Sequence, residues 1–493
     1  MIAAYFSLGK GTGLEIMACP AVGEPKGDEL VIDIDIPPIV DPPLWPECCI
    51  YKVPKKLRQV STEEAYTPKV VSIGPFHYNL EESKGVKMQK LKYFNEFCVR
   101  TGKSKKDLVS FIAKEEAHIR RYYSETFELI DQKMFVKLIS LDAIFIIELF
   151  WKNFECEKDD YILSNAWLES HVKQDLILLE NQLPFEFLQN FYKYAFEGKK
   201  VAPFLELACQ FFFSDKHPIK PCMEPEVKHF TDLLRKYYSP NPKPDPEPAK
   251  NLNKKPKPDP EPAKNLNKKP KHDPKPPKNL RYTATKLHEM GLEFKAVVDR
   301  DPSKRSLLDL EFAKNNLLEQ YPCFNLSWLF SCLPCLKSRQ CTESVRCILK
   351  VPQLVIDDQT EALFRNLIAL EQCHYPSNTY ICNYVVLLDS FITTKEDVCL
   401  LFEKKVILNM RGSSKAVTTF VNTLGHQIVE SESRYDELYQ QLNTHCDSIW
   451  NRLVASLTSV YFKDFWRGTA TIVGILFLGV TFVNFLRPFV MKN

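Results

Sequence analysis

The sequence has little glycine and lacks the short motifs that identify common enzyme classes. Only 15 of its 493 residues are glycine, which leaves little material for the glycine-rich loops that hold phosphate groups. It contains no G-x-x-x-x-G-K-[ST] loop, no G-x-G-x-x-G fingerprint and no G-x-S-x-G motif. We therefore predict that the protein is not an enzyme and that it has no catalytic, cofactor-binding or metal-binding residue.

A strong net charge is also missing. The chain has 65 Lys+Arg against 62 Asp+Glu, a formal net charge of +3. This small excess gives no electrostatic reason to expect a nucleic-acid partner. Hydrophobic residues make up 45% and charged residues 26%, proportions that are typical of a globular protein.

The N-terminus lacks a secretory signal. Its first residues, MIAAYFSLGKGTG, contain only a short apolar stretch with no basic residue before it and no clear cleavage site. The 16 cysteines are mostly scattered singly, which favours reduced, buried thiols over a disulfide framework. Both observations predict that the body of the protein lies in the cytosol.

A proline- and lysine-rich repeat interrupts the chain. KPDPEPAKNLNKKP occupies Lys243–Pro256 and occurs again, unchanged, at Lys257–Pro270. Such proline density excludes helix and sheet and predicts an extended, disordered linker. Two functional interpretations are a proline-motif ligand and a basic membrane-surface tether, and the alternative is repeat-expanded filler in a tolerant loop.

The rest of the body has helical patterns and few strand signals. Met134–Trp151 is apolar on nearly every face and predicts a core helix. Asp175–Leu188 predicts a second buried helix that ends near Pro184. Val355–His374 predicts a helix capped by Asp357 or Asp358. Apolar residues three and four apart between Tyr435 and Val460 predict an amphipathic helix, which could mediate oligomerisation.

A run without charges stands near the C-terminus. Gly468–Leu486 comprises 19 uncharged residues, which as a helix would rise roughly 28 Å, close to the thickness of a bilayer core. We predict a single transmembrane helix that anchors the protein by its tail, in the plasma membrane or an endomembrane. The expected spanning residues are Gly468, Ile472, Leu476, Phe482 and Leu486, and the expected interfacial residues are Lys463, Phe465, Trp466, Arg467 and Arg487.

The predicted fold class is therefore mainly α, a helical globular body with a single C-terminal transmembrane helix. The segments are, in order, a flexible lead-in (1–44), a first part of the helical body (45–238), the disordered linker (239–280), a second part of the body (281–465) with a cysteine-rich loop (313–347), the transmembrane helix (468–486) and a short tail (487–493).

Glutamate and histidine pairs offer an alternative, metal-dependent function. On a helix, Glu-x-x-His places both side chains on one face, and two such helices with two further glutamates form a di-iron site. The alternative is that these groups are hydrogen-bonded or lie at the surface. The candidate pairs are Glu115/His118, Glu226/His229 and Glu371/His374, and the candidate extra ligands are Glu148 and Glu180.

Two further groups of residues attract attention. Cys332 and Cys335 have the spacing of half a zinc site or of a redox pair, and Cys341 and Cys347 follow in the same loop. Cysteines without a ligand are the alternative. His77 follows a Gly-Pro turn, for which we predict a structural role.

The segment Ile50–Tyr78, IYKVPKKLRQVSTEEAYTPKVVSIGPFHY, resembles the opening signature of the plant family known as domain of unknown function 247. The similarity continues, in the family's order, through Glu115–Glu125, Asp175–Leu188, His229–Arg235, Ala284–Lys295, Leu307–Phe312, Val355–Tyr375 and Tyr384–Ile392. The resemblance implies a plant origin, a mainly helical body and membrane association, and it implies no catalytic residue. Some members have been linked to pollen–stigma self-recognition, which implies a role in interaction.

We therefore expect a membrane-anchored helical protein that acts through protein–protein interaction or signalling. The alternative is a membrane-tethered enzyme that binds a metal through the Glu/His pairs.

Overall fold

The computed structural model describes the greater part of the helical body. The described residues are 45–59, 63–157, 159–213, 227–239, 279–298, 306–313, 347–410, 412–429, 433–460 and 465–490. The predicted lead-in, nearly all of the predicted linker and the cysteine-rich loop up to residue 346 lie outside these ranges. The predictions made for them stay predictions.

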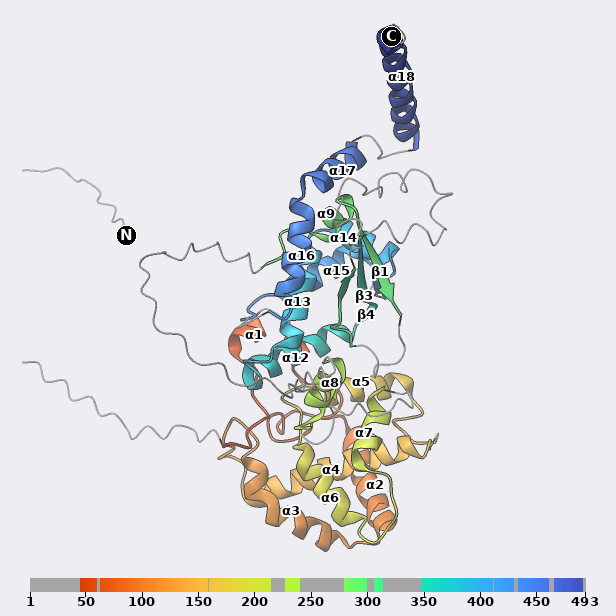
Figure 1. Ribbon diagram of the computed structural model, residues 1–493. Coiled ribbons are helices and arrows are strands. Elements are labelled where there is room, and N and C mark those ends of the chain that lie inside the picture. Colours follow the sequence, from red (N-terminus) through yellow and green to blue (C-terminus); the bar gives the residue numbers. More distant parts are fainter. Residues whose placement is uncertain are drawn as a thin grey trace, which may run out of the picture. The chain divides into compact units, whose positions relative to one another are not determined.

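Helices dominate the described residues (Figure 1), which confirms the predicted mainly helical body. The first part of the chain forms α1 (Lys55–Gln59), a 3-10 turn (Glu63–Ala65), α2 (Lys84–Thr101), α3 (Lys105–Arg120), α4 (Gln132–Phe154), α5 (Ala166–Leu176), α6 (Phe185–Ala195), α7 (Phe204–Phe213) and α8 (Phe230–Tyr238). The second part forms α9 (Ala284–Glu289), α12 (Thr360–His374), α13 (Tyr380–Phe391), α14 (Lys395–Glu403), α15 (Ser414–Leu424), α16 (Asp436–Asp447), α17 (Ile449–Val460) and α18 (Phe465–Val490).

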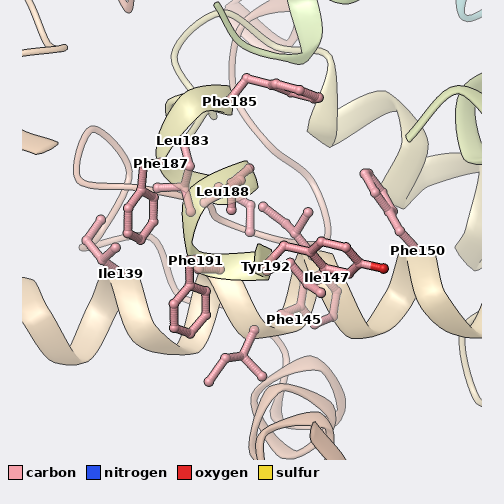
Figure 2. Packing of buried hydrophobic residues seen from close by; sticks show 14 of the residues in the cluster. Ile139, Phe145, Ile147, Phe150, Leu183, Phe185, Phe187, Leu188, Phe191 and Tyr192 are labelled. Carbon is pink, nitrogen blue, oxygen red and sulfur yellow. The ribbon is translucent and has the colours of Figure 1, made fainter. Parts of the chain in front are cut away.

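The predicted core helix is confirmed as α4. Its side chains from Ala143 to Phe150 are all 0% exposed, over two full turns. This burial on every face is possible because α4 packs against α2, α3, α6 and α7. Figure 2 shows Phe145 and Phe150 of α4 among the aromatic and aliphatic side chains that α6 contributes to this core.

The predicted helix over Asp175–Leu188 is wrong. Helix α5 ends at Leu176, and Pro184 is the residue before α6 instead of the end of a helix. Between them the chain turns, because the side chains of Glu180, Asn181 and Gln182 accept backbone N–H groups of other segments, Val53, Ile73 and Phe230. Proline suits the start of a helix, where its missing N–H has no helical partner to lose.

Short strands that were not predicted belong to the second part of the chain. β1 (Leu292–Val297) pairs parallel with β3 (Cys347–Pro352), and β2 (Glu311–Ala313) pairs antiparallel with β3. β4 (Leu354–Ile356) pairs parallel with β5 (Ile407–Asn409). Each strand finds its partner at long range in the sequence, so the short apolar runs alone did not reveal them.

The capped helix predicted near Val355 is confirmed with a later start. Val355 lies on β4, and α12 begins at Thr360. The side chain of Asp357 accepts the backbone N–H groups of Gln359 and Thr360 at 3.0 and 2.9 Å. It therefore satisfies amides of the first helical turn, as predicted.

The single amphipathic helix predicted over Tyr435–Val460 is wrong in its continuity. Ser448 leaves the helical conformation and separates α16 from α17. The break divides the apolar stripe. Leu442 of α16 is 0% exposed, whereas Ile449 and Leu453 of α17 are 74% and 50% exposed.

The predicted membrane anchor requires a correction. Helix α18 covers it, yet none of the helices in the described ranges combines the length and the apolarity that a membrane crossing demands. This finding overturns the single C-terminal transmembrane helix in the predicted fold class.

The spanning and interfacial roles predicted for residues of this segment depended on that transmembrane helix. Leu476 and Phe482 are 63% and 62% exposed. Lys463 lies outside the described residues.

The close contact between Gly74 and Gln182 can be tested by substitution. The φ of Gly74 is +74°, and a Cβ atom there would lie 2.7 Å from the carbonyl oxygen of Gln182. We expect Gly74→Ala to lower the free energy of unfolding by about 2–4 kcal/mol, measured by urea denaturation. The control is Gly198→Ala, where φ is +76° but nothing lies within 4 Å of the new Cβ. Strain alone predicts a loss of about 1 kcal/mol there, and equal losses in both variants would contradict the close contact.

Candidate functional site

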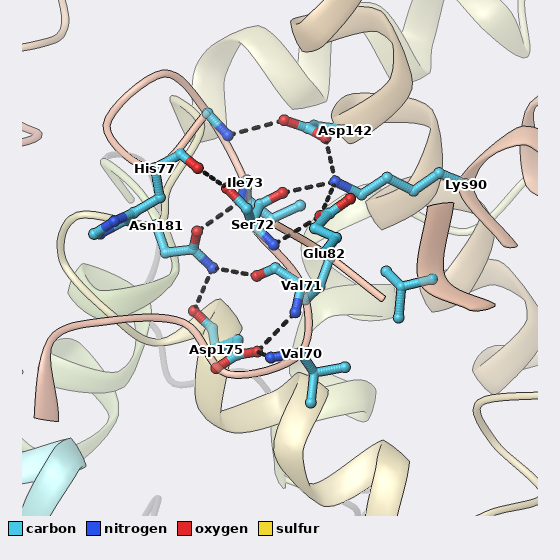
Figure 3. Close-up of polar contacts among 12 residues, drawn as sticks. Val70, Val71, Ser72, Ile73, His77, Glu82, Lys90, Asp142, Asp175 and Asn181 are labelled. Carbon is cyan, nitrogen blue, oxygen red and sulfur yellow. Dashed lines mark hydrogen bonds and ion pairs between the residues drawn. The ribbon is translucent and has the colours of Figure 1, made fainter. Parts of the chain in front are cut away.

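The extended segment Lys69–Gly74, which we call the signature segment, is held by side chains instead of by a sheet. Asp175, at the end of α5, accepts the backbone N–H groups of Lys69, Val70 and Val71 at 2.7–2.9 Å. Figure 3 shows the contacts of Asp175 with Val70 and Val71. One carboxylate therefore satisfies three successive amides, which otherwise would be left unpaired by the extended backbone.

The next three amides of the signature segment follow the same rule. Ser72 N–H donates to Glu82 at 2.9 Å, Ile73 N–H to Asn181 at 2.6 Å and Gly74 N–H to Asp142 at 2.9 Å. Three different regions of the chain thus contribute one acceptor each. The backbone of the segment is fixed only when α4, the turn after α5 and the residues before α2 are in place.

Lys90 of α2 neutralises this arrangement. Its ammonium donates to Ser72 O at 2.7 Å, Glu82 at 2.7 Å and Asp142 at 2.8 Å (Figure 3). Burial by itself would lower the pKa of Lys90, but the carboxylates of Asp142 and Glu82 outweigh burial and raise it. Lys90 is therefore a permanent cation in the interior, and its role is structural.

A second acceptor, Glu180, ties down the residues on either side of the signature segment. It accepts Val53 N–H at 2.6 Å and pairs with Arg58 of α1. His77 Nε2 lies 3.4 Å from the same carboxylate, and its backbone oxygen accepts the Ser72 hydroxyl. The structural role predicted for His77 agrees with this position.

A junction cluster joins the first and second parts of the chain. We define it as Tyr51, His229, Asp232, Arg235, Glu371, His374 and Tyr375. Arg235 of α8 donates to Glu371 of α12 at 2.9 Å, and its guanidinium lies 3.9 Å from the centre of the Tyr375 ring. Tyr375 in turn donates to Asp232 at 2.8 Å.

Two histidines of the junction cluster are held neutral. His229 is 0% exposed, and its Nε2 lies 3.1 Å from Cys49 O, which makes it the donor. Burial lowers the pKa of His229 to about 4. Burial also lowers the pKa of His374, whose Nδ1 lies 3.0 Å from the Tyr51 hydroxyl. Neutral imidazoles in fixed hydrogen bonds suit a structural joint.

The proposed metal ligands are committed to other partners. Glu371 binds Arg235 and the N–H groups of Ile381 and Cys382 at 3.1 and 2.9 Å. Glu148 binds Arg100, as Glu180 binds Arg58.

The other Glu/His pairs give no support to a metal site. Glu115 and His118 form a half-exposed pair of their own, and Glu226 lies outside the described residues. Across the described ranges, no three His, Cys, Asp or Glu side chains are arranged to hold a metal ion. The described geometry therefore does not favour the metalloenzyme alternative.

Sequence reasoning missed the lysine and arginine partners of these carboxylates. Lys90, Arg58, Arg100 and Arg235 carry no motif of their own. A signal did exist, since an acidic residue inside an apolar helix such as α4 requires a cation or several N–H groups near it. What the sequence does not say is which of 65 basic residues fills that place.

Lys90 gives a direct test of the signature network. Lys90→Met leaves Asp142 and Glu82 without their cation, so we expect a loss of about 3–5 kcal/mol in the free energy of unfolding. The matched control is Lys92→Met on the same helix, whose side chain is 54% exposed and should cost less than about 0.5 kcal/mol. Urea denaturation of both variants measures the free energy of unfolding. Similar losses in the two variants would contradict the structural role assigned to Lys90.

The neutral state of His229 predicts a pH dependence. Its folded pKa of about 4 lies below the unfolded value of 6.5, so the unfolded chain binds the extra proton. The contribution of His229 to the free energy of unfolding is fully present above pH 6.5 and is lost as the pH falls toward 4. The loss between pH 7 and pH 5 is about 2 kcal/mol. His229→Gln should flatten the fall in this window, whereas His118→Gln, at the surface, should not. An unchanged slope in His229→Gln would refute the prediction.

The chain belongs to a plant protein family. The model of DUF247, described as plant protein of unknown function, matches residues 50–480, which confirms the resemblance. A UPF0481 protein of Arabidopsis thaliana is 28% identical over 435 residues, covering 85% of this chain and 81% of the relative. A putative UPF0481 protein of the same plant is 23% identical over 495 residues, covering 89% and 91%. No solved structure matches the chain.

Proposed function

We propose that this member of the DUF247 family acts through protein–protein interaction, and that it binds a second copy of itself through α17. The observation that carries the proposal is the exposed apolar face of this helix. Ile449, Trp450 and Leu453 are 74%, 51% and 50% exposed. Ile449 and Leu453 are four residues apart and therefore lie on one face of the helix, one turn from each other.

The exposed face continues a stripe that is buried in α16. There, Leu442 and Cys446 pack into the core of the second part of the chain. After the break at Ser448, the same spacing of apolar residues turns toward solvent. Covering a large apolar side chain completely contributes roughly 1.5–3 kcal/mol, so this face favours association.

Few charges oppose a contact through this face. Between Ile449 and Val460 the helix carries one charged residue, Arg452. Asp447, at the end of α16, already pairs with Arg281 and accepts the hydroxyl of Tyr282. A twofold contact through the apolar face is self-complementary, as dimer interfaces are.

The area needed for a stable dimer extends beyond α17. A standard interface buries about 1,200–2,000 Å², more than one face of a short helix supplies. α18 adds apolar surface of the same kind, with Val473, Phe477 and Val480 exposed by 61–70%. Self-association of α17 together with α18 would cover this surface.

The cysteines support a reducing compartment, and we extend the proposal to a cytosolic body. The adjacent and buried Cys48 and Cys49 are free thiols. Buried thiols that remain reduced are typical of intracellular proteins.

Substitution of Trp450 tests the proposed dimer. We expect the full-length protein to sediment as a dimer at micromolar concentration. Trp450→Glu places a charge in the contact and should weaken association by at least about tenfold, which corresponds to 1.4 kcal/mol. The matched control is Trp167→Glu on α5, where the tryptophan is 63% exposed and association should be unchanged.

Sedimentation velocity provides the measurement. A monomeric wild-type protein, or equal effects of the two substitutions, would refute self-association through α17. Binding of the monomer to lipid vesicles that Trp450→Glu abolishes would also contradict it, because the apolar face would then have a different occupant.

A further inference from the structure

A cleft with no assigned role lies between the first and second parts of the body. Its volume is about 370 Å³, and its walls come from α5, α7 and α8 on one side and from β4 and the start of α12 on the other. Small-molecule sites in proteins commonly measure 300–1,000 Å³. None of its lining residues belongs to α17 or to the junction cluster, so the cleft is independent of the proposed dimer contact.

The walls of the cleft are mainly apolar. Ile177, Phe212 and Leu234 line one side, and Leu363 and Phe364 line the other. Such walls favour a ligand whose transfer out of water costs little free energy. The rings of Phe212 and Phe364 favour a flat, unsaturated ligand.

The charged side chains that line the cleft have partners within the chain. Lys173 pairs with Glu169 at 2.7 Å. Asp357 accepts the first amides of α12 and the hydroxyl of Thr360, and the positive end of that helix partly offsets a negative charge there. Neither side chain is therefore an unpartnered ion that would select a charged ligand.

Two polar side chains at the cleft are free to bind a ligand. Gln174 of α5 and Tyr238 of α8 line it, and within the described part of the chain neither side chain makes a hydrogen bond. Burial raises the pKa of Tyr238, so its hydroxyl is neutral and can donate. Gln353, by contrast, is engaged, since its amide donates to Lys405 O at 2.7 Å.

We propose that this cleft binds a small, uncharged, largely apolar molecule with fused or conjugated rings and at least one hydroxyl or carbonyl group. The apolar walls hold the ring system, and Tyr238 and Gln174 bind the polar group. Specificity then comes from these two hydrogen-bonding side chains, because buried polar groups left unpaired weaken the binding of an analogue that lacks the matching group.

The test uses 1-hydroxypyrene and pyrene, two fluorescent probes that differ by one hydroxyl, with the full-length protein. Val355 lines the cleft from β4 and is 44% exposed, so Val355→Trp takes up space in the cleft. It should weaken the binding of both probes by at least about tenfold, since the ring system loses its space. The matched control is Val99→Trp on α2, where the valine is 85% exposed and does not line the cleft.

Tyr238→Phe separates recognition from simple partition. It should weaken the binding of 1-hydroxypyrene by about threefold to tenfold, the value of one hydrogen bond, and leave pyrene unaffected. Binding that Val355→Trp does not change would show that the probes bind elsewhere and would overturn the proposal. Equal responses of the two probes to Tyr238→Phe would overturn the assignment of the polar group.

Discussion

The fold of this protein depends on six successive backbone amides. These amides have no hydrogen-bond partner in a helix or a strand. The signature segment, Lys69–Gly74, runs from an exposed residue, Lys69, into the interior, where Val71, Ser72 and Ile73 are buried. Each of its N–H groups donates to a side-chain oxygen of Asp175, Glu82, Asn181 or Asp142. Buried amides without acceptors would each cost about 1–3 kcal/mol, so the segment and its acceptors must form together. The ammonium group of Lys90 neutralises two of these carboxylates, Glu82 and Asp142, which lowers the free-energy cost of burying them.

The same logic extends to the second part of the chain. Asp175 lies at the end of α5, and Glu180 and Asn181 belong to the turn that follows. This turn also contacts α12, because Leu179 N–H donates to Asn366. The junction cluster then adds Arg235 and Glu371. Several segments that resemble the family signature are therefore the ones that bind each other in the interior. The surface of α17 and the cleft beside α12 lie outside these hydrogen-bond networks.

Prediction from sequence succeeded where one element determined the pattern. The apolar run of α4 required burial on every face, and Asp357 had to cap the helix that follows it. It failed where a side chain had a distant partner. The sequence did not identify Arg100, Arg58 and Arg235 as the partners of Glu148, Glu180 and Glu371, and so it left a metal site open as an alternative. The helix expected from Asp175 to Leu188 failed for the same reason, because its polar side chains bind backbone far away in the sequence.

The amino-acid sequence by itself determined a helical body, the composition of the proline-rich linker and membership of the family, since each depends on local propensity or on residue order. Tertiary structure decided the rest. It placed the apolar stripe of α16 in the core and that of α17 in solvent, because one residue, Ser448, leaves the helix between them. It also chose the arginines that pair with Glu148, Glu180 and Glu371. Among the described residues, it left the side chains of Tyr238 and Gln174 without a hydrogen bond beside a cleft. These outcomes depend on contacts between residues that are often more than a hundred positions apart, and no local pattern encodes such contacts.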